Sequence, residues 1–192
     1  MMVLPNHARM FIAVGINDAV RMALTRMQRR LALAQGHVGW TKPENIHCTL
    51  LFLGDVPTAE IPAVADAVTT AAADCKRCVV EIAGLGCFGS SRVPRVIWAG
   101  VCPAAPLIEM YQQVCRRLPQ VGDAAARAKE FHPHLTIGRV RSARNAESLT
   151  AAIARNADTV FGALEITEIC LMESQLRPDG PVYTLRHKAP FK

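Results

Sequence analysis

The stretches His47-Cys48-Thr49-Leu50 and His134-Leu135-Thr136-Ile137 share one pattern, H-x-T followed by an apolar residue. Each lies in an apolar run of the kind that forms a β-strand. Because side chains alternate between the two faces of a strand, the histidine and the threonine of each copy point to the same side. The copies are separated by nearly half of the 192-residue chain. The sequence therefore predicts two similar lobes that together present two imidazoles and two hydroxyls.

A pair of imidazoles suits general acid and base catalysis, since a neutral ring accepts a proton and a protonated ring donates one. The ordinary pKa of histidine, near 6.5, makes both forms accessible around neutral pH. Neither motif contains an acidic side chain, and Arg139 follows the second motif by two residues. Hydroxyls and a guanidinium donate hydrogen bonds to anions. A phosphoryl group held between His47 and His134 fits this set, whereas a single copy of the motif would be better explained as a core histidine.

A metal site is the main alternative that the residues leave open. His132 and His134 have H-x-H spacing, and His47 could be a third ligand. Against this, Pro133 is expected to keep His132 outside the strand, and no carboxylate lies close in sequence to orient the imidazoles. The sequence contains neither a G-x-S-x-G nucleophile motif nor a Walker motif.

The composition is that of a folded globular domain, with 51% hydrophobic and 20% charged residues. The length fits one domain, 1–192, made of two closely packed lobes. The formal charge of +6 favours phosphorylated or polyanionic partners, although a charge of this size also serves ordinary solubility. No run reaches the roughly 18 apolar residues of a membrane-spanning helix.

The seven cysteines are an odd number in mostly apolar contexts, and the N-terminus lacks the pattern of a secretory signal. Reduced thiols and a cytoplasmic location are therefore expected. Cys75-Lys76-Arg77-Cys78 has C-x-x-C spacing, but no second such pair accompanies it. Zinc binding or redox chemistry is only weakly supported by a single pair.

Hydrophobic periodicity and turn residues predict an α+β fold with two related lobes. The last strand follows a turn at Arg177-Pro178-Asp179-Gly180. Helices are expected from Asn17 to about Gly36 and over 60–73, 107–118 and 146–154. Strands are expected over 10–14, 38–40, 46–53, 79–85, 95–101, 134–140, 160–172 and 182–187.

The two motifs and their surroundings resemble the two-histidine (2H) phosphoesterase superfamily, and within it the RNA 2',3'-cyclic phosphodiesterase family, also called the 2'-5' RNA ligase family. The resemblance implies a bilobal, pseudo-symmetric fold with a central cleft between two antiparallel sheets and helices outside. It also implies hydrolysis of a terminal ribose 2',3'-cyclic phosphate to a 2'-phosphomonoester, without metal or cofactor, and in some members the joining or cleavage of 2'-5' linkages. Cys48 replaces a larger aliphatic residue and is expected to affect packing rather than chemistry. The segments that carry the resemblance are 9–13, 40–54, 95–100, 131–139 and 178–183.

With this resemblance, His134 is expected to be the base that activates water and His47 the acid that protonates the departing O3'. Thr49, Thr136 and Arg139 are expected to stabilise charge on the phosphoryl oxygens. The symmetry of the two motifs leaves the roles of the histidines exchangeable.

Aromatic and basic residues around the motifs are candidates for binding an RNA end. Phe11, Trp40 and Tyr183 are candidates for stacking on a base, with core packing as the alternative for each. Basic residues that could guide RNA to the site are Arg9, Lys42, Arg92, Arg95, Arg141 and Arg177.

The expected partners are RNA ends or nucleotides bearing a 2',3'-cyclic phosphate, with no membrane, no obligatory protein partner and a monomeric state. Two other classes of function stay open at this point. One is a non-catalytic module that binds a nucleotide or RNA end, and the other is a metal-dependent phosphodiesterase. Turnover, and its response to a chelator, would separate the three.

Overall fold

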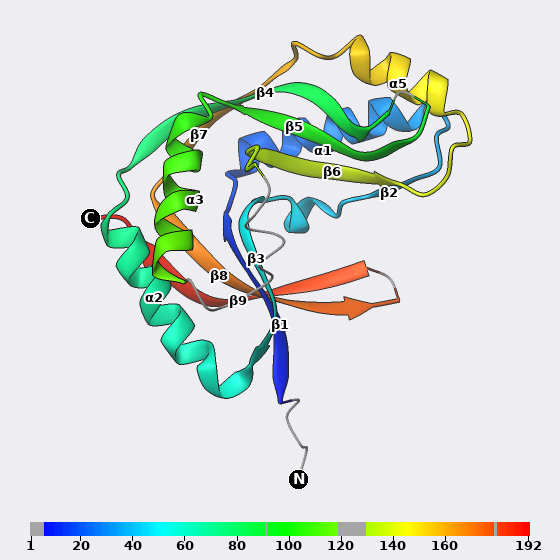
Figure 1. The fold of residues 1–192 in the computed structure, drawn as a ribbon. Coiled ribbons are helices and arrows are strands. Elements are labelled where there is room, and N and C mark those ends of the chain that lie inside the picture. Colours follow the sequence, from blue (N-terminus) through cyan, green and yellow to red (C-terminus); the bar gives the residue numbers. More distant parts are fainter. Residues whose placement is uncertain (1–5, 91, 119–129, 179) are drawn as a thin grey trace.

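The structure is a computed structural model in which residues 6–90, 92–118, 130–178 and 180–192 are described (Figure 1). The strands are β1 (His7–Val14), β2 (Val38–Trp40), β3 (Cys48–Pro57), β4 (Cys78–Gly89), β5 (Pro94–Cys102), β6 (His134–Val140), β7 (Val160–Ile166), β8 (Glu168–Arg177) and β9 (Gly180–Pro190). The helices are α1 (Asp18–Ala32), α2 (Ile61–Ala73), α3 (Ala105–Arg117) and α5 (Ala146–Ala154), with short 3-10 turns at Pro43–Asn45 and Thr58–Glu60.

All strand pairs are antiparallel and form one nine-stranded sheet with the order β7-β4-β5-β6-β3-β1-β8-β9, to which β2 is added beside β6. The sheet has two halves. The first half consists of β1, β3, β8 and β9, and the second of β2, β4, β5, β6 and β7. The halves meet at a single residue pair, Cys48 of β3 with Leu135 of β6.

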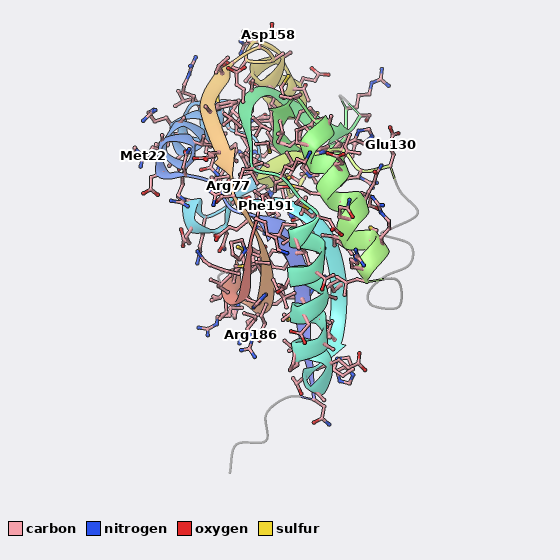
Figure 2. All side chains as sticks on the ribbon, turned by 90° about the vertical axis from the view of Figure 1, so that its left-hand side faces the viewer. Met22, Arg77, Glu130, Asp158, Arg186 and Phe191 are labelled. Carbon is pink, nitrogen blue, oxygen red and sulfur yellow. The ribbon has the colours of Figure 1, made fainter. Side chains whose placement is uncertain are left out.

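The helices of the described residues lie outside the sheet, two of them with each half. In Figure 1, α1 and α5 accompany the second half, where α1 contacts β7 and α5 contacts β4. The other two helices contact strands of the first half, α2 with β8 and β9 and α3 with β3. Figure 2 shows α2 and α3 side by side on one face of the molecule. The predicted α+β class with two related lobes is thus confirmed, although the lobes share one sheet that is continuous through one pair.

The first helix illustrates how the sequence specifies these elements. Asn17 caps α1 by accepting a hydrogen bond from the backbone N–H of Val20 (2.9 Å), which satisfies one of the free donors of the first turn. Gln28, a buried polar residue of this helix, donates to the carbonyls of Thr41 and Ile137, both at 2.8 Å. The bond to Ile137 fixes α1 against the second motif strand, and the bond to Thr41 fixes it against the segment after β2. The helix ends at Ala32, before the predicted end near residue 36.

The predicted strand over 160–172 is two strands instead of one. Residues 160–166 pair with β4 in the second half, whereas the strand that begins at Glu168 pairs with β1 in the first half. The chain therefore crosses from one half to the other at Thr167. The predicted turn before the last strand includes residue 179, which lies outside the described residues. Among the described residues, no helix combines the length and apolar character needed to cross a membrane.

Candidate active site

The single pair that joins the two halves also brings the two motifs together. Cys48 and Leu135 lie opposite each other on adjacent antiparallel strands and are 1% and 0% exposed, so both side chains point into the core. His47 and His134 immediately precede these two residues, and the two threonines immediately follow them. By strand alternation, the histidines and threonines are directed away from the core, around a local twofold axis through the central pair. Cys48 packs in the core as expected, and burial raises the pKa of its thiol to about 12.

His47 is held by hydrogen bonds at both ring nitrogens. Its Nδ1 lies 2.8 Å from the carbonyl oxygen of Asn45, and its Nε2 lies 2.9 Å from Oγ1 of Thr49. Because a carbonyl can only accept, Nδ1 carries the proton of the neutral ring, and Nε2 then accepts from the Thr49 hydroxyl. The lone pair of Nε2 is thus on the motif face, in the tautomer that a general base requires.

His134 repeats the first of these contacts. Its Nδ1 donates to the carbonyl oxygen of His132 at 2.7 Å, two residues earlier in the chain, as in the first motif. The same tautomer follows, with the lone pair of the neutral ring on Nε2. Pro133 lies between these residues, and β6 begins only at His134, as the sequence predicts. The His132 ring is largely exposed and lies 3.6 Å from a carboxylate oxygen of Glu130.

Both histidines favour the neutral form in the free protein. The pKa of His47 is lowered to about 4, mainly by burial and in smaller part by the positive charge of a protonated His134, against the effect of the Asn45 carbonyl. Burial also lowers the pKa of His134, helped by the nearby Arg139 guanidinium and opposed by the His132 carbonyl. The influence of His134 on the pKa of His47 supports the closeness of the two rings. The two imidazoles differ in environment, since burial has the larger effect on His47.

Aromatic rings account for the deeper burial of His47. The Phe11 ring stacks on the imidazole with centroids 4.9 Å apart and planes 25° apart, and Tyr183 meets the imidazole edge-on at 5.2 Å. The sequence predicts Phe11 as a stacking surface for a base, but the residue is 2% exposed. Its ring is covered by His47, by Tyr183 at 4.9 Å and by Phe52 at 6.1 Å. Phe11 therefore supports the imidazole and offers no open face to a base.

The charge of Arg139 acts on two groups, the Tyr183 hydroxyl in the first half of the sheet and the His134 imidazole in the second half. Its charge, together with that of Arg9, lowers the pKa of the Tyr183 hydroxyl, although burial has the larger effect and the net shift is upward. The exposed side chain of Arg139 is thus a cation beside both motifs. The predicted residues His47, Thr49, His134, Thr136, Arg139 and Tyr183 are brought to one region.

Trp40 is placed differently from the other candidates. It pairs with Gly138, where an added Cβ would come within 3.1 Å of two atoms of the indole, so the ring lies over that glycine. The partly buried side chain also packs against the hydrophobic core. Trp40 therefore packs within the protein, which the sequence leaves open as the alternative to stacking on a base.

Among the described residues, Asn45, Phe88 and Trp98 lie beside a motif histidine or Thr136 without having been predicted as site residues. Asn45, 7% exposed, supplies the carbonyl that orients His47 and donates from its side chain to the Pro181 carbonyl (2.8 Å), which ties the first motif to β9. Phe88 meets His134 edge-on at 4.9 Å, and its ring centroid lies 5.6 Å from that of Trp98. Trp98 is the cross-strand neighbour of Thr136 in β5. Asn45 has a local sequence signal, its place in the turn before the motif, whereas Phe88 and Trp98 have none.

The other chemical candidates have weaker geometry. Among residues 6–90, 92–118, 130–178 and 180–192, no three His, Cys, Asp or Glu side chains gather as a metal site would require. All seven cysteines are free thiols. In the C-x-x-C segment, burial raises the pKa of Cys75 to about 11, opposite to the low pKa of redox-active thiols.

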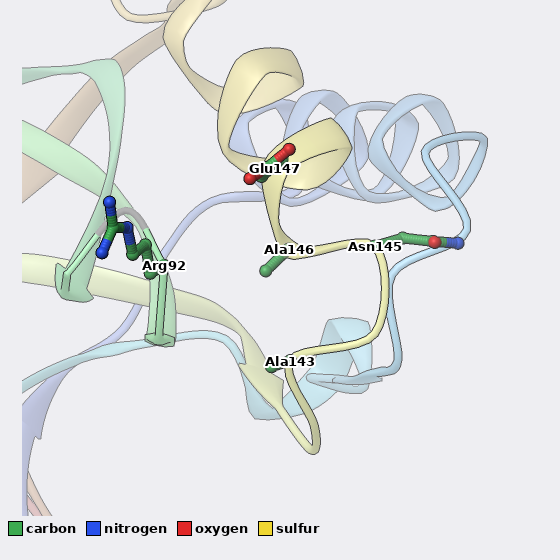
Figure 3. A pocket seen from close by; sticks show the side chains of 5 residues that line it. All are labelled: Arg92, Ala143, Asn145, Ala146 and Glu147. Atoms are coloured by element: carbon green, nitrogen blue, oxygen red, sulfur yellow. The ribbon is translucent and has the colours of Figure 1, made fainter.

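A surface hollow beside the second half contains one of the predicted guiding residues. Figure 3 shows Arg92, from the turn between β4 and β5, facing the loop that leads into α5. The remaining lining residues are Ala143, Asn145, Ala146 and Glu147. No motif residue lines this hollow, and Glu147 opposes the positive charge of Arg92. It is therefore separate from the site around the two histidines.

Residues 16–177 match the family model described as the 2'-5' RNA ligase superfamily. The chain belongs to this superfamily. The resemblance predicted from the motifs is therefore confirmed, because the matched range includes both H-x-T motifs.

Similar proteins cover nearly all of the chain. It is 31% identical over 176 residues to the RNA 2',3'-cyclic phosphodiesterase of Methanothermobacter thermautotrophicus, and the match covers 92% of this chain and 95% of the relative. The crystal structure of TT0787 of Thermus thermophilus superposes with a TM-score of 0.79 at 27% identity, covering 95% of this chain and 97% of the other. E. coli LigT complexed with 3'-AMP has the same fold, with a TM-score of 0.72, 21% identity and coverage of 97% and 99%.

Proposed function

We propose that this protein hydrolyses 2',3'-cyclic phosphates at RNA ends to 2'-phosphomonoesters through general acid and base catalysis by His47 and His134. The observation that carries the proposal is the Cys48–Leu135 pair, which places two identical H-x-T motifs around one local twofold axis. Family membership and the 31% identical RNA 2',3'-cyclic phosphodiesterase support the substrate class. Because the reaction needs one proton accepted and one donated, two imidazoles suffice without a metal.

In this reaction the oxygen of a water molecule forms a bond to phosphorus while the bond from phosphorus to O3' breaks. One histidine takes the proton of the attacking water, and the other gives a proton to O3', so that the ribose 3'-hydroxyl is restored and the phosphate stays on O2'. The negative charge on the other phosphoryl oxygens increases in the transition state. Thr49, Thr136 and Arg139 are the donors proposed to stabilise this charge.

The direction of proton transfer distinguishes the two histidines. The assignment from the sequence makes His134 the base and His47 the acid. With a pKa of about 4, His47 is neutral in the free protein, so it can act as an acid only if the negative charge of the bound phosphate raises this pKa enough for the ring to take up a proton from solvent. In the reverse assignment His47 is the base, and the neutral form that it has in the free protein is the form that a base needs. A cyclic substrate with sulfur in place of O3' separates the assignments, because the sulfur leaves without protonation and restores turnover only to the variant that lacks the acid.

We also propose that residues 1–192 act as one domain and as a monomer in the cytoplasm. The first half of the sheet combines β1 and β3 with β8 and β9, so neither half is a continuous segment of chain that could fold alone. All the predicted site residues come from a single chain. Size-exclusion chromatography with light scattering tests the monomeric state.

The decisive experiment is hydrolysis of a short RNA ending in a 2',3'-cyclic phosphate, with EDTA present, by the wild type, His47→Ala and His134→Ala. We expect a 2'-phosphate product from the wild type and a loss of about 100- to 10,000-fold in turnover in each variant. Saturable binding without turnover in the wild type would favour the binding module. Loss of activity in EDTA with rescue by zinc would favour the metal-dependent phosphodiesterase.

A further inference from the structure

The row of aromatic side chains around His47 continues to a residue whose ring is open to solvent. Phe52 of β3 is 49% exposed, and its centroid lies 6.1 Å from that of Phe11, which in turn lies 4.9 Å from His47. The rings of Phe52 and His47 are thus no more than about 11 Å apart. Stacked nucleotides of one strand advance about 3.4 Å each, so this distance falls within the first few nucleotides of a bound strand.

An irregularity in β3 at Leu50 places Phe52 on the same face as the motif residues, and a second one at Leu53 does the same for Asp55. Regular alternation would put residues 49 and 52 on opposite faces, but register shifts in the pairing of β1 with β3 leave Leu50 and Leu53 as extra residues. Both leucines are buried in the core, 3% and 2% exposed. The cross-strand pairs on the motif side are Ala13 with Thr49, Phe11 with Phe52 and Arg9 with Asp55.

Arg9 supplies a cation beside this ring. It precedes Phe11 by two residues on β1, which pairs with β8 without a register shift from Met10 to Ala13, and its side chain is exposed. The influence of Arg9 and Arg139 on the Tyr183 hydroxyl shows that both guanidiniums lie near that ring. A line of groups therefore leads from the histidines past Tyr183 to Arg9 and Phe52.

From this arrangement we infer that Phe52 and Arg9 form a subsite for the nucleotides that precede the cyclic phosphate, with a base stacked on Phe52 and a backbone phosphate bound by Arg9. An exposed aromatic face beside a cation is the combination that single-stranded nucleic-acid sites use. The inference rests on the proposed function and specifies its substrate as an RNA end in preference to a cyclic mononucleotide. Asp55, opposite Arg9 in the register, opposes phosphate binding at the same place.

The test compares kcat/KM for a trinucleotide ending in a 2',3'-cyclic phosphate with kcat/KM for the corresponding cyclic mononucleotide. We expect the wild type to favour the trinucleotide. The ratio should fall about 5- to 150-fold in Phe52→Ala, mainly through KM of the trinucleotide, and Phe52→Tyr should retain most of it. Arg9→Gln should lower the ratio and reduce the salt dependence of trinucleotide binding by about one phosphate contact. Asp55→Asn should raise the ratio, because it removes a negative charge beside the proposed phosphate position.

Controls separate this subsite from a general effect. Leu33→Ala removes an exposed apolar side chain just after α1, and Arg26→Ala removes an exposed basic side chain within α1. Both variants should keep the wild-type ratio. A wild-type ratio in both Phe52→Ala and Arg9→Gln would overturn the inference while leaving the proposed function intact. If the wild type hydrolyses neither substrate, the proposed function fails. Fluorescence anisotropy with a labelled trinucleotide 2'-phosphate then tests the subsite separately, because Phe52→Ala must still weaken binding.

Discussion

His47 makes the stability of this protein depend on pH in a direction that its burial determines. The ordinary pKa of histidine, near 6.5, applies in the unfolded chain, whereas in the folded protein the pKa of His47 is about 4. As the pH falls through 6.5, the unfolded state takes up a proton that the folded state does not, so the free energy of unfolding decreases. The loss is complete below about pH 4 and amounts to about 3 kcal/mol at 1.36 kcal/mol per pH unit. At pH 4.5 the free energy of unfolding should already be lower by about 2.5 kcal/mol.

The perturbation is His47→Asn, which removes the imidazole from this site. The assay is urea unfolding of wild type and variant at several values between pH 7.5 and pH 4.5. The difference in free energy of unfolding between the two proteins should change by about 2.5 kcal/mol over this range, with the wild type losing more. His7→Asn, at an exposed position at the start of β1, is the matched control and should follow the wild type. Parallel pH profiles for wild type and His47→Asn would refute the argument that burial keeps this ring neutral.

Three further changes test other parts of the site and its support. Thr136→Val should lower turnover on an RNA cyclic phosphate about 100-fold or more without changing the circular dichroism spectrum, because it removes one donor to the phosphoryl oxygens. Gly86→Ala should destabilise the protein by about 1–3 kcal/mol in urea unfolding, since its Cβ would lie 2.2 Å from the Trp98 ring, while Gly15→Ala, with nothing within 4 Å of its Cβ, should not show this loss. Gln28→Met should lower the free energy of unfolding, measured with urea, by about 1–3 kcal/mol, because the Thr41 carbonyl loses its side-chain donor while the Ile137 carbonyl keeps the backbone N–H of Thr41.

The elements with strong local signals were predictable from the sequence. The second motif strand, 134–140, and the helix at 146–154 have the predicted boundaries. Proline before the motif and hydrophobic periodicity define these ends locally. The motif residues could also be predicted, because strand alternation alone determines which side chains share a face.

What could not be predicted depends on pairing between distant segments. The apolar run from 160 to 172 contains no signal for a break, because the break at Thr167 arises from the choice of different partner strands in the two halves. The bulge that turns Phe52 toward the motif face has the same origin, since a register shift is a property of two strands. Phe88 contacts His134 across 46 positions of the sequence, so no local pattern reports it.

The backbone around the two motifs is nearly symmetric, but the surroundings of the two imidazoles are not. Phe11 stacks on His47, whereas His134 meets only the edge-on ring of Phe88 among the described aromatic contacts. The cross-strand neighbour of Thr49 is Ala13, and that of Thr136 is the much larger Trp98. Hydrolysis needs an acid and a base at the same time, and two imidazoles in identical surroundings would bind protons with equal affinity. On the proposed mechanism, the duplicated motif therefore provides the acid and the base, and the unequal aromatic packing around them gives the two imidazoles different proton affinities.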